Sequence, residues 1–128
     1  IKTALIQLPG HIMMAFKLGQ IPIDQAQAVG LPYYTPINGQ VWIPVETTLI
    51  KDGFVAAWEA ALNQIRDTGV GGSSATVEEA WEKYGLSPIH GVEQQFFIPK
   101  NRTLTRIKSD LASSWFQEFL RAFVRITN

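Results

Sequence analysis

The spacing of apolar residues changes once along this chain, near Asp52, and that change limits the folds that the sequence can adopt. Before Asp52, apolar side chains alternate with a period of two, which is typical of β-strands. After it they recur every three or four residues, which is typical of amphipathic helices. Strands followed by helices predict an α+β fold, in which helices flank an antiparallel sheet.

The first two strands are expected on either side of the turn at Pro9-Gly10. Residues 2–8 carry apolar side chains on both faces, which favours a strand inside a sheet rather than at its edge. In residues 11–17 one face is purely apolar and consists of Ile12, Met14 and Phe16. We expect this face to point into the core, and the opposite face, which begins with His11, to border solvent or a cleft.

Residues 18–36 are rich in Gly and Pro and show only weak periodicity. They are expected to form a long loop with a short helix at residues 24–28. Loops of this length often lie over a binding site, so Tyr33 and Tyr34 are candidates for substrate contacts.

Asn38-Gly39 is the strongest hairpin signal in the chain, and residues 33–37 and 40–45 are its expected arms. The spacing of apolar side chains in residues 54–65 then predicts a helix. Asp52 is the expected N-cap of this helix, because a carboxylate before the first apolar residue can accept a free backbone N–H.

The second half of the chain begins with a Gly- and Ser-rich joint at residues 69–74. It divides a core at residues 1–69 from a helical C-terminal extension of the same domain at residues 70–128. A capping box at residues 76–79 predicts a short helix. Residues 104–124 have helical spacing throughout, which predicts a long C-terminal amphipathic helix with an aromatic-rich face.

Composition excludes several classes of function. The chain has 128 residues, of which 46% are hydrophobic, enough for a single core. Its 11 basic and 11 acidic residues cancel, so nothing global indicates nucleic acid or an anionic membrane. No apolar stretch is long enough to span a bilayer. The absence of Cys and the presence of only two His argue against a metal site, and no cofactor is expected.

Two residues are candidates for chemistry. His11 follows a tight turn and opens a strand, where an imidazole can act as a general base or acid; the alternative is a structural or surface histidine. Glu46 ends the apolar strand of residues 41–45 and could accept a hydrogen bond from His11 Nδ1, as the acid of a catalytic triad does. The alternative is that Glu46 caps its own turn through Thr47 or Thr48.

Taken together, these segments resemble a known family. A strand, Pro-Gly-His and a second strand over residues 4–16, followed by Trp-Ile-Pro-Val-Glu-Thr-Thr at residues 42–48, is similar to the C-terminal half of the transglutaminase-like superfamily. That family has a papain-like cysteine-peptidase fold. The resemblance covers residues 2–65 and implies that His11 is the triad histidine and Glu46 the triad acid.

The sequence departs from the family pattern at three points. It contains no Cys, the acid is Glu46 rather than the commoner Asp, and residues 18–38 would be an insertion between two adjacent strands. In the family, the Cys lies on a helix that precedes the His-bearing strand. Since the chain begins at Ile1 rather than Met, we expect it to be a segment of a longer protein that supplies the Cys.

The resemblance implies a fragment of a bacterial enzyme domain that acts on peptide or glutamine-type amides by Cys-His-acid acyl transfer. Without the thiol, the chain alone is expected to be inactive. Expected substrate contacts are Tyr33, Tyr34 and Trp42, and the expected compartment is the cell envelope or periplasm. Expected partners are a peptide or protein substrate and the rest of the parent chain, or a second copy bound through an exposed apolar face. The alternative is a non-catalytic binding or structural module that retains the fold.

Overall fold

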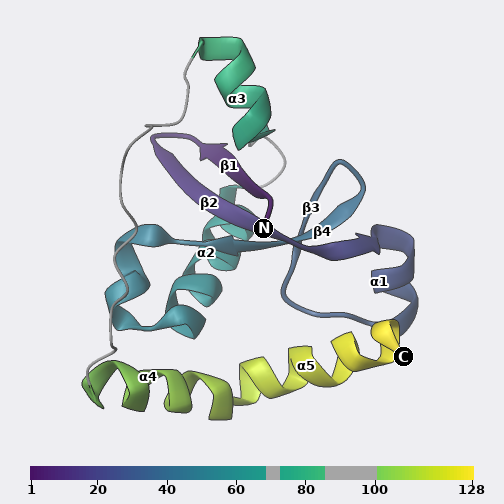
Figure 1. The fold of residues 1–128 in the computed structure, drawn as a ribbon, viewed down its shortest axis with the longest axis vertical. Helices are drawn as coiled ribbons and strands as arrows, with labels where there is room; N and C mark the ends of the chain where they lie inside the picture. Colours follow the sequence, from purple (N-terminus) through teal and green to yellow (C-terminus); the bar gives the residue numbers. More distant parts are fainter. Residues whose placement is uncertain (69–72, 86–100) are drawn as a thin grey trace.

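A computed structural model describes residues 1–68, 73–85 and 101–128 of the chain. Five strands form one antiparallel sheet in the order β3-β4-β2-β1-β5 (Figure 1). The strands are β1 Thr3–Leu8, β2 His11–Pro22, β3 Thr35–Ile37, β4 Gln40–Val45 and β5 Ser73–Thr76. The helices are α1 Ile23–Val29, α2 Phe54–Thr68, α3 Val77–Tyr84, α4 Asn101–Ala112 and α5 Ser114–Thr127, with a 3₁₀ segment η1 at Thr47–Asp52. The predicted α+β class is confirmed.

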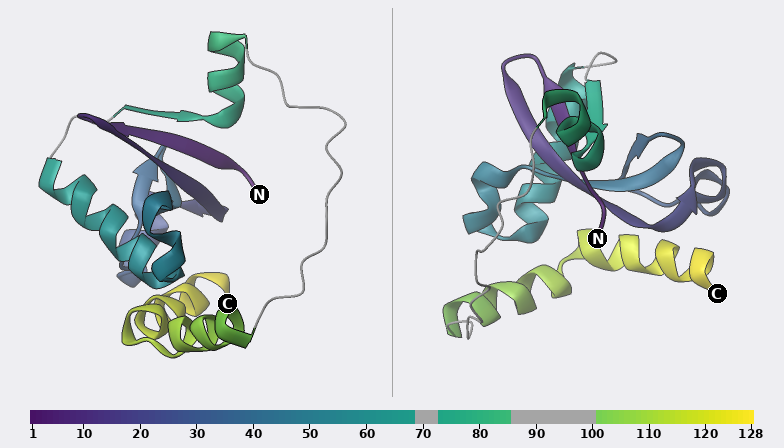
Figure 2. Two further views of the ribbon diagram at one scale, coloured as in Figure 1. Left: turned by 90° about the vertical axis from the view of Figure 1, so that its left-hand side faces the viewer. Right: turned by 45° about the horizontal axis from the view of Figure 1, so that its top comes forward.

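The helices lie around the sheet rather than on one side of it. In Figure 1, α3 lies at the top, α4 and α5 run along the bottom, and α1 lies at the far end of β2. Figure 2 shows α2 between the sheet and the α4–α5 pair. No helix within the described ranges is both long and apolar enough to cross a membrane.

From His11 to Ala15 the buried face of β2 is the opposite of the predicted one, whereas Phe16 of the predicted face is half-buried and packs against the larger core. Met13 and Ala15 are each 1% exposed, whereas Ile12 is 57% exposed. The cause is the pairing with β1, in which Met13 lies opposite Ile6 and Ala15 opposite Ala4. Directly opposed residues share a face, and this face packs against α2. The buried face of β1 therefore decides which face of β2 is buried.

The segment between β2 and β3 is more regular than predicted. β2 continues to Pro22, and α1 occupies the place of the short helix expected at residues 24–28. The predicted hairpin of β3 and β4 is confirmed, with φ angles of 50° at Asn38 and 72° at Gly39. Two successive residues with positive φ are what a tight turn of the hairpin type requires.

Trp58 of α2 is the centre of the larger core. Its side chain is 1% exposed, and its Nε1–H donates to the carbonyl of Tyr33 at 2.8 Å. Four aromatic rings surround it at centroid distances of 4.9 to 6.4 Å, those of Tyr33, Phe54, Trp115 and Phe119. Since Trp115 and Phe119 belong to α5, this aromatic cluster attaches the C-terminal helix to the rest of the domain.

The N-terminus of α2 is capped from a distant part of the chain. Asp52, the predicted N-cap, lies in η1 and is separated from α2 by Gly53, so that prediction is wrong. Instead, Asp110 of α4 accepts the Phe54 N–H through Oδ2 at 2.7 Å. A Cβ at Gly53, whose φ is 106°, would lie 2.9 Å from that same oxygen. Glycine is therefore required both by the backbone conformation and by the close approach of the cap.

Replacement of Asp110 by alanine is expected to lower the free energy of unfolding by about 1 kcal/mol, because it leaves a helix N–H without its acceptor. The matched control is Asp52→Ala, for which no comparable loss is expected, since Asp52 is exposed and caps nothing at α2. Urea unfolding of both variants measures the difference. A larger loss in the Asp52 variant would contradict the assignment of the cap.

The C-terminal region holds two helices where one was predicted. Ser113 ends α4, and its Oγ accepts the Phe116 N–H at 3.1 Å, so that it is the N-cap of α5. The predicted capping box is confirmed: Thr76 and Glu79 exchange hydrogen bonds at the start of α3. The residues just before Thr76 pair with β1 as β5, an edge strand of the same sheet. Residues 69–72 of the predicted joint, and His90, the second histidine of the chain, lie outside the described residues.

Candidate functional site

The strand register places Glu46 beside the beginning of β2. Met14 pairs with Val45 and Ala15 with Pro44. One further step along both strands sets Glu46 opposite Met13, on the face that also carries His11. The backbone N–H of Glu46 donates to the carbonyl of Ala57 in α2 at 3.0 Å, which fixes the end of β4 against that helix.

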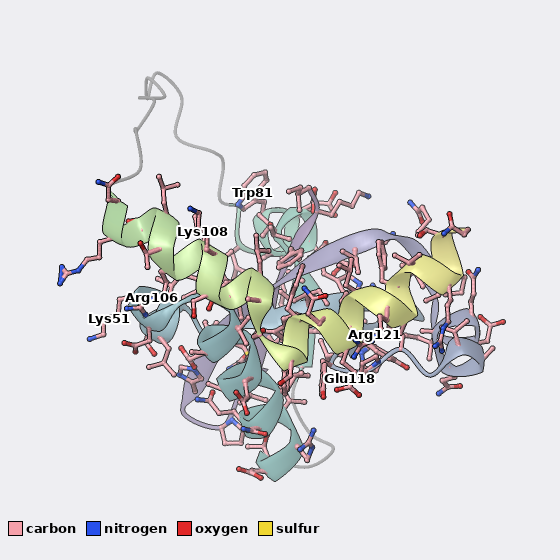
Figure 3. All side chains as sticks on the ribbon, turned by 90° about the horizontal axis from the view of Figure 1, so that it is seen from below. Lys51, Trp81, Arg106, Lys108, Glu118 and Arg121 are labelled. Carbon is pink, nitrogen blue, oxygen red and sulfur yellow. The ribbon has the colours of Figure 1, made fainter. Side chains whose placement is uncertain are left out.

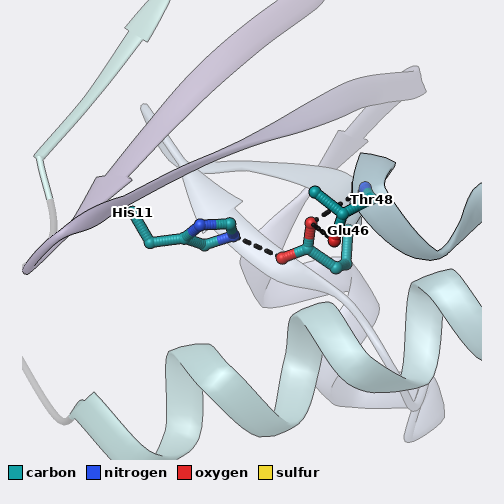
Figure 4. Close-up of polar contacts among 3 residues, drawn as sticks. All are labelled: His11, Glu46 and Thr48. Carbon is teal, nitrogen blue, oxygen red and sulfur yellow. Dashed lines mark hydrogen bonds and ion pairs between the residues drawn. The ribbon is translucent and has the colours of Figure 1, made fainter.

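His11 and Glu46 are in direct contact, as Figure 4 shows. The contact joins His11 Nε2 to Glu46 Oε2, whereas the sequence-based expectation named Nδ1. When Nε2 carries its hydrogen and donates to the carboxylate, Nδ1 is left without a proton and can accept one. The position of the ring hydrogen follows from this hydrogen bond.

Thr48 holds the other oxygen of the same carboxylate. Glu46 Oε1 accepts the Thr48 backbone N–H at 3.1 Å and its hydroxyl at 2.8 Å (Figure 4). Glu46 is 1% exposed and is also the N-cap of η1. The two interpretations of Glu46, as the partner of His11 and as the cap of its own turn, therefore hold at once, one through each oxygen.

Glu46 is held in its ionised form. Burial by itself raises the pKa of Glu46, but the hydrogen bonds from the Thr48 N–H, the Thr48 hydroxyl and His11 outweigh it. The net effect is a pKa below the ordinary value near 4.5. At neutral pH, His11 thus faces a buried, fixed negative charge.

This lowered pKa predicts a pH dependence of stability. The folded state binds fewer protons at Glu46 than the unfolded state, so this part of the stability is fully present above the ordinary pKa. It is lost as the pH falls through the folded pKa. Urea unfolding between pH 6 and pH 3 is expected to show a shallower loss of stability in Glu46→Gln than in the unaltered chain. The matched control, Glu59→Gln at an exposed site on α2, is expected to keep the original slope, and a shallower slope there would contradict the assignment.

The ring of His11 reaches the surface between two shallow pockets. Its side chain is 35% exposed. One pocket, of about 320 Å³, is lined by Leu8, Pro9 and the last turns of α2 at Gln64, Asp67 and Thr68. The other, of about 440 Å³, is lined by Gln7, Leu8, Gly10 and Ile12. Buried Gln64 Oε1 has no hydrogen-bond partner among the described residues and adds an unused acceptor beside the first pocket. No local sequence pattern marks Gln64, so it is not among the predicted site residues.

The other predicted site residues lie elsewhere. Tyr33 stacks on Trp115 at a centroid distance of 3.6 Å and donates its hydroxyl to Glu118 at 2.5 Å. Tyr34 packs against the same core as Trp58, and Trp42 is 3% exposed. None of the three lines either pocket beside His11. The structure thus brings together His11 and Glu46 alone of the five, and substrate contact by the aromatic residues stays a prediction.

The described residues contain no group of three or more His, Asp or Glu side chains that could hold a metal ion. Comparison of the chain with protein-family models, with curated proteins and with solved structures found no match.

Proposed function

We propose that the protein supplies the base and the orienting acid of a Cys-His-acid site for acyl transfer from peptide or glutamine-type amides. The observation that carries this proposal is the contact of His11 Nε2 with a buried, ionised Glu46. Such a carboxylate fixes the orientation and tautomer of the imidazole and stabilises its protonated form. The second nitrogen, on a partly exposed ring, is then available to a nucleophile.

The thiol comes from polypeptide outside these 128 residues, which contain no Cys. In the first step its proton moves to His11 Nδ1, and the thiolate attacks the amide carbonyl. The C–N bond then breaks, and His11 returns the proton to the leaving amine. Water or a second amine attacks the thioester and releases the thiol. Proteolysis, amide hydrolysis and amine transfer share this intermediate.

The similarity of residues 4–16 and 42–48 to the transglutaminase-like superfamily supports the choice of amides as substrates. It remains a resemblance of motifs. The assignment to a bacterial cell-envelope protein depends on the same resemblance and stays a prediction.

A second candidate is a non-catalytic binding module. The observation that favours it is the exposed apolar surface on the outer side of β2, where Ile12 is 57% and Met14 38% exposed. In this case the carboxylate of Glu46 serves only to cap η1 and to hold the start of β2 through His11.

The test uses the full-length polypeptide that contains these residues, incubated with a glutamine-containing peptide in the absence and in the presence of hydroxylamine. Without hydroxylamine we expect a thioester adduct on one Cys, detected by mass spectrometry, and with hydroxylamine we expect the hydroxamate and a free thiol. Treatment with iodoacetamide is expected to abolish the adduct and the hydroxamate, and the 128-residue chain alone is expected to form neither. A full-length polypeptide without Cys and without activity would reject acyl transfer and leave the binding module, whereas activity that survives iodoacetamide would reject a Cys nucleophile.

A further inference from the structure

The two ends of the molecule carry exposed surfaces of opposite charge. At the top of Figure 1, the acidic end consists of α3, with exposed Glu78, Glu79, Glu82 and Lys83. At the bottom, the basic end consists of α4 and α5, with exposed Arg102, Arg106, Lys108, Arg121 and Arg125. In Figure 3, which views the molecule from below, the basic end lies nearest the viewer and carries the labelled Lys108 and Arg121.

The helices of the basic end, α4 and α5, carry five basic residues and two acidic ones, and both acidic residues contact the body. Asp110 accepts the Phe54 N–H, and Glu118 accepts the hydroxyl of Tyr33. The basic side chains form no ion pair within the described part of the chain. Since Glu118 remains exposed, the positive charge of the basic end is a net one, of five basic residues against two acidic ones.

The basic end also exposes an apolar row. Leu104, Ile107 and Leu111 follow one another at helical spacing on α4 and are 43%, 45% and 49% exposed. No residue of α4 is buried. The hydrogen bonds that join α4 to the rest of the domain come from Asp110, which accepts the Phe54 N–H, and from Arg106, which donates to the Lys51 carbonyl at 3.3 Å. An amphipathic helix that binds its own domain through polar contacts leaves its apolar row for another surface.

The acidic end offers a matching apolar surface. Trp81 is 37% and Tyr84 66% exposed. Tyr84 also lines a pocket of about 270 Å³ between α3 and the sheet, together with Leu5, Ile12 and Ala80 among others. A pocket of this kind can take up an aliphatic side chain, and exposed aromatic residues are typical of protein interfaces.

We propose that the basic end of one copy of this chain binds the acidic end of a second copy, head to tail. One such interface would cover both exposed apolar surfaces and pair their opposite charges. Because the two surfaces are different and lie at opposite ends, an assembly of any length has one free acidic end and one free basic end. The contact therefore continues into longer assemblies unless a ring closes.

The first test is the mass of the chain in solution as its concentration rises. By analytical ultracentrifugation at low salt, we expect the average mass to grow past twice 14.3 kDa without a plateau at the dimer. Raising NaCl from 0.05 to 0.5 M is expected to weaken association about tenfold, because salt screens the charges. A monomer at all concentrations, or a dimer insensitive to salt, would overturn the proposal.

The second test separates the two surfaces. The head of the molecule is the acidic end and the tail is the basic end. A head variant, E78K/E82K, alters only the acidic end, and a tail variant, I107S/L111S, alters only the apolar row of α4. Each variant alone is expected to stay monomeric, since every interface needs one intact surface of each kind. An equal mixture is expected to form a 1:1 pair and to grow no further. Lys2→Glu, at an exposed site on neither end, is the control and is expected to assemble like the unaltered chain.

Circular dichroism checks that the variants fold, and Tyr84→Ser replaces the head variant if α3 is lost. A mixture that stays monomeric would reject head-to-tail binding. So would a variant that still dimerises, which would indicate a symmetric contact such as one through Ile12 and Met14. A chain that stays monomeric but sediments with phosphatidylserine vesicles would show instead that the basic end binds anionic lipid.

Discussion

If the proposed acyl transfer takes place, replacement of His11 by alanine in a polypeptide that supplies the Cys is expected to slow thiol acylation by about 10²–10⁴-fold, the usual contribution of a positioned general base. The reason is that, among the described residues, His11 is the only base that contacts the Glu46 carboxylate. The other contacts of that carboxylate come from Thr48, whose N–H and hydroxyl donate to it and do not take up the proton of the thiol. Single-turnover kinetics with an activated peptide ester or amide measure the rate. A loss of less than tenfold would contradict the role of His11 as the base.

The partners of His11 give a graded series. Glu46→Gln is expected to slow thiol acylation by a factor within the same range, because a neutral amide cannot stabilise the imidazolium. Thr48→Val removes the hydroxyl that donates to Glu46 Oε1 and is expected to slow acylation less than Glu46→Gln does. Thr48→Ser retains that hydroxyl and is expected to keep most of the acylation rate. Thr47→Val is the matched control, since the described contacts of Glu46 do not include the Thr47 side chain. An equal loss in both valine variants would show a general effect on η1 rather than positioning of Glu46.

Replacement of Trp58 by alanine is expected to lower the free energy of unfolding by about 3–5 kcal/mol, as for other large-to-small changes in a core. The indole is 1% exposed, and four aromatic rings contact it. Its loss also leaves the Tyr33 carbonyl without a donor. Urea unfolding measures the change in the free energy of unfolding. A loss at the upper end of this range would be a large part of the total stability of a small domain.

Two further variants separate packing from hydrogen bonding at this position. Trp58→Phe keeps most of the ring contacts but removes the Nε1–H, and is expected to cost about 1–3 kcal/mol. Trp81→Ala, at a tryptophan that is 37% exposed, is expected to cost clearly less than Trp58→Ala. A similar loss at both tryptophans would contradict the assignment of Trp58 as the centre of the core.

The features that the sequence predicted correctly are those fixed by a few neighbouring residues. The turn at Asn38-Gly39 depends on two positive φ angles, and the capping box of α3 depends on Thr76 and Glu79, three positions apart. The change of apolar period near Asp52 marks the passage from strands to helices, and with it the α+β class. Each of these signals is complete within one turn or one element.

The features that the sequence did not predict depend on residues far apart in the chain. The cap of α2 is Asp110, 56 positions from Phe54, and no local pattern points to it. The break at Ser113 falls inside an uninterrupted helical pattern, since a serine can either continue a helix or cap a new one. The atom of His11 that meets Glu46 follows from how the imidazole ring is turned in the fold, which neither residue fixes locally.

The sequence by itself therefore determined the α+β class, the turn between β3 and β4, the capping box of α3 and the two polar residues that end up at one site, but not β5 or the division between α4 and α5. The tertiary structure decided which face of β2 is buried, which nitrogen of His11 meets Glu46, and that α4 is held through Asp110. The physical reason is that turns and caps gain their hydrogen bonds within a few residues. The burial of a face and the pairing of distant side chains depend instead on which surfaces meet when the whole chain packs.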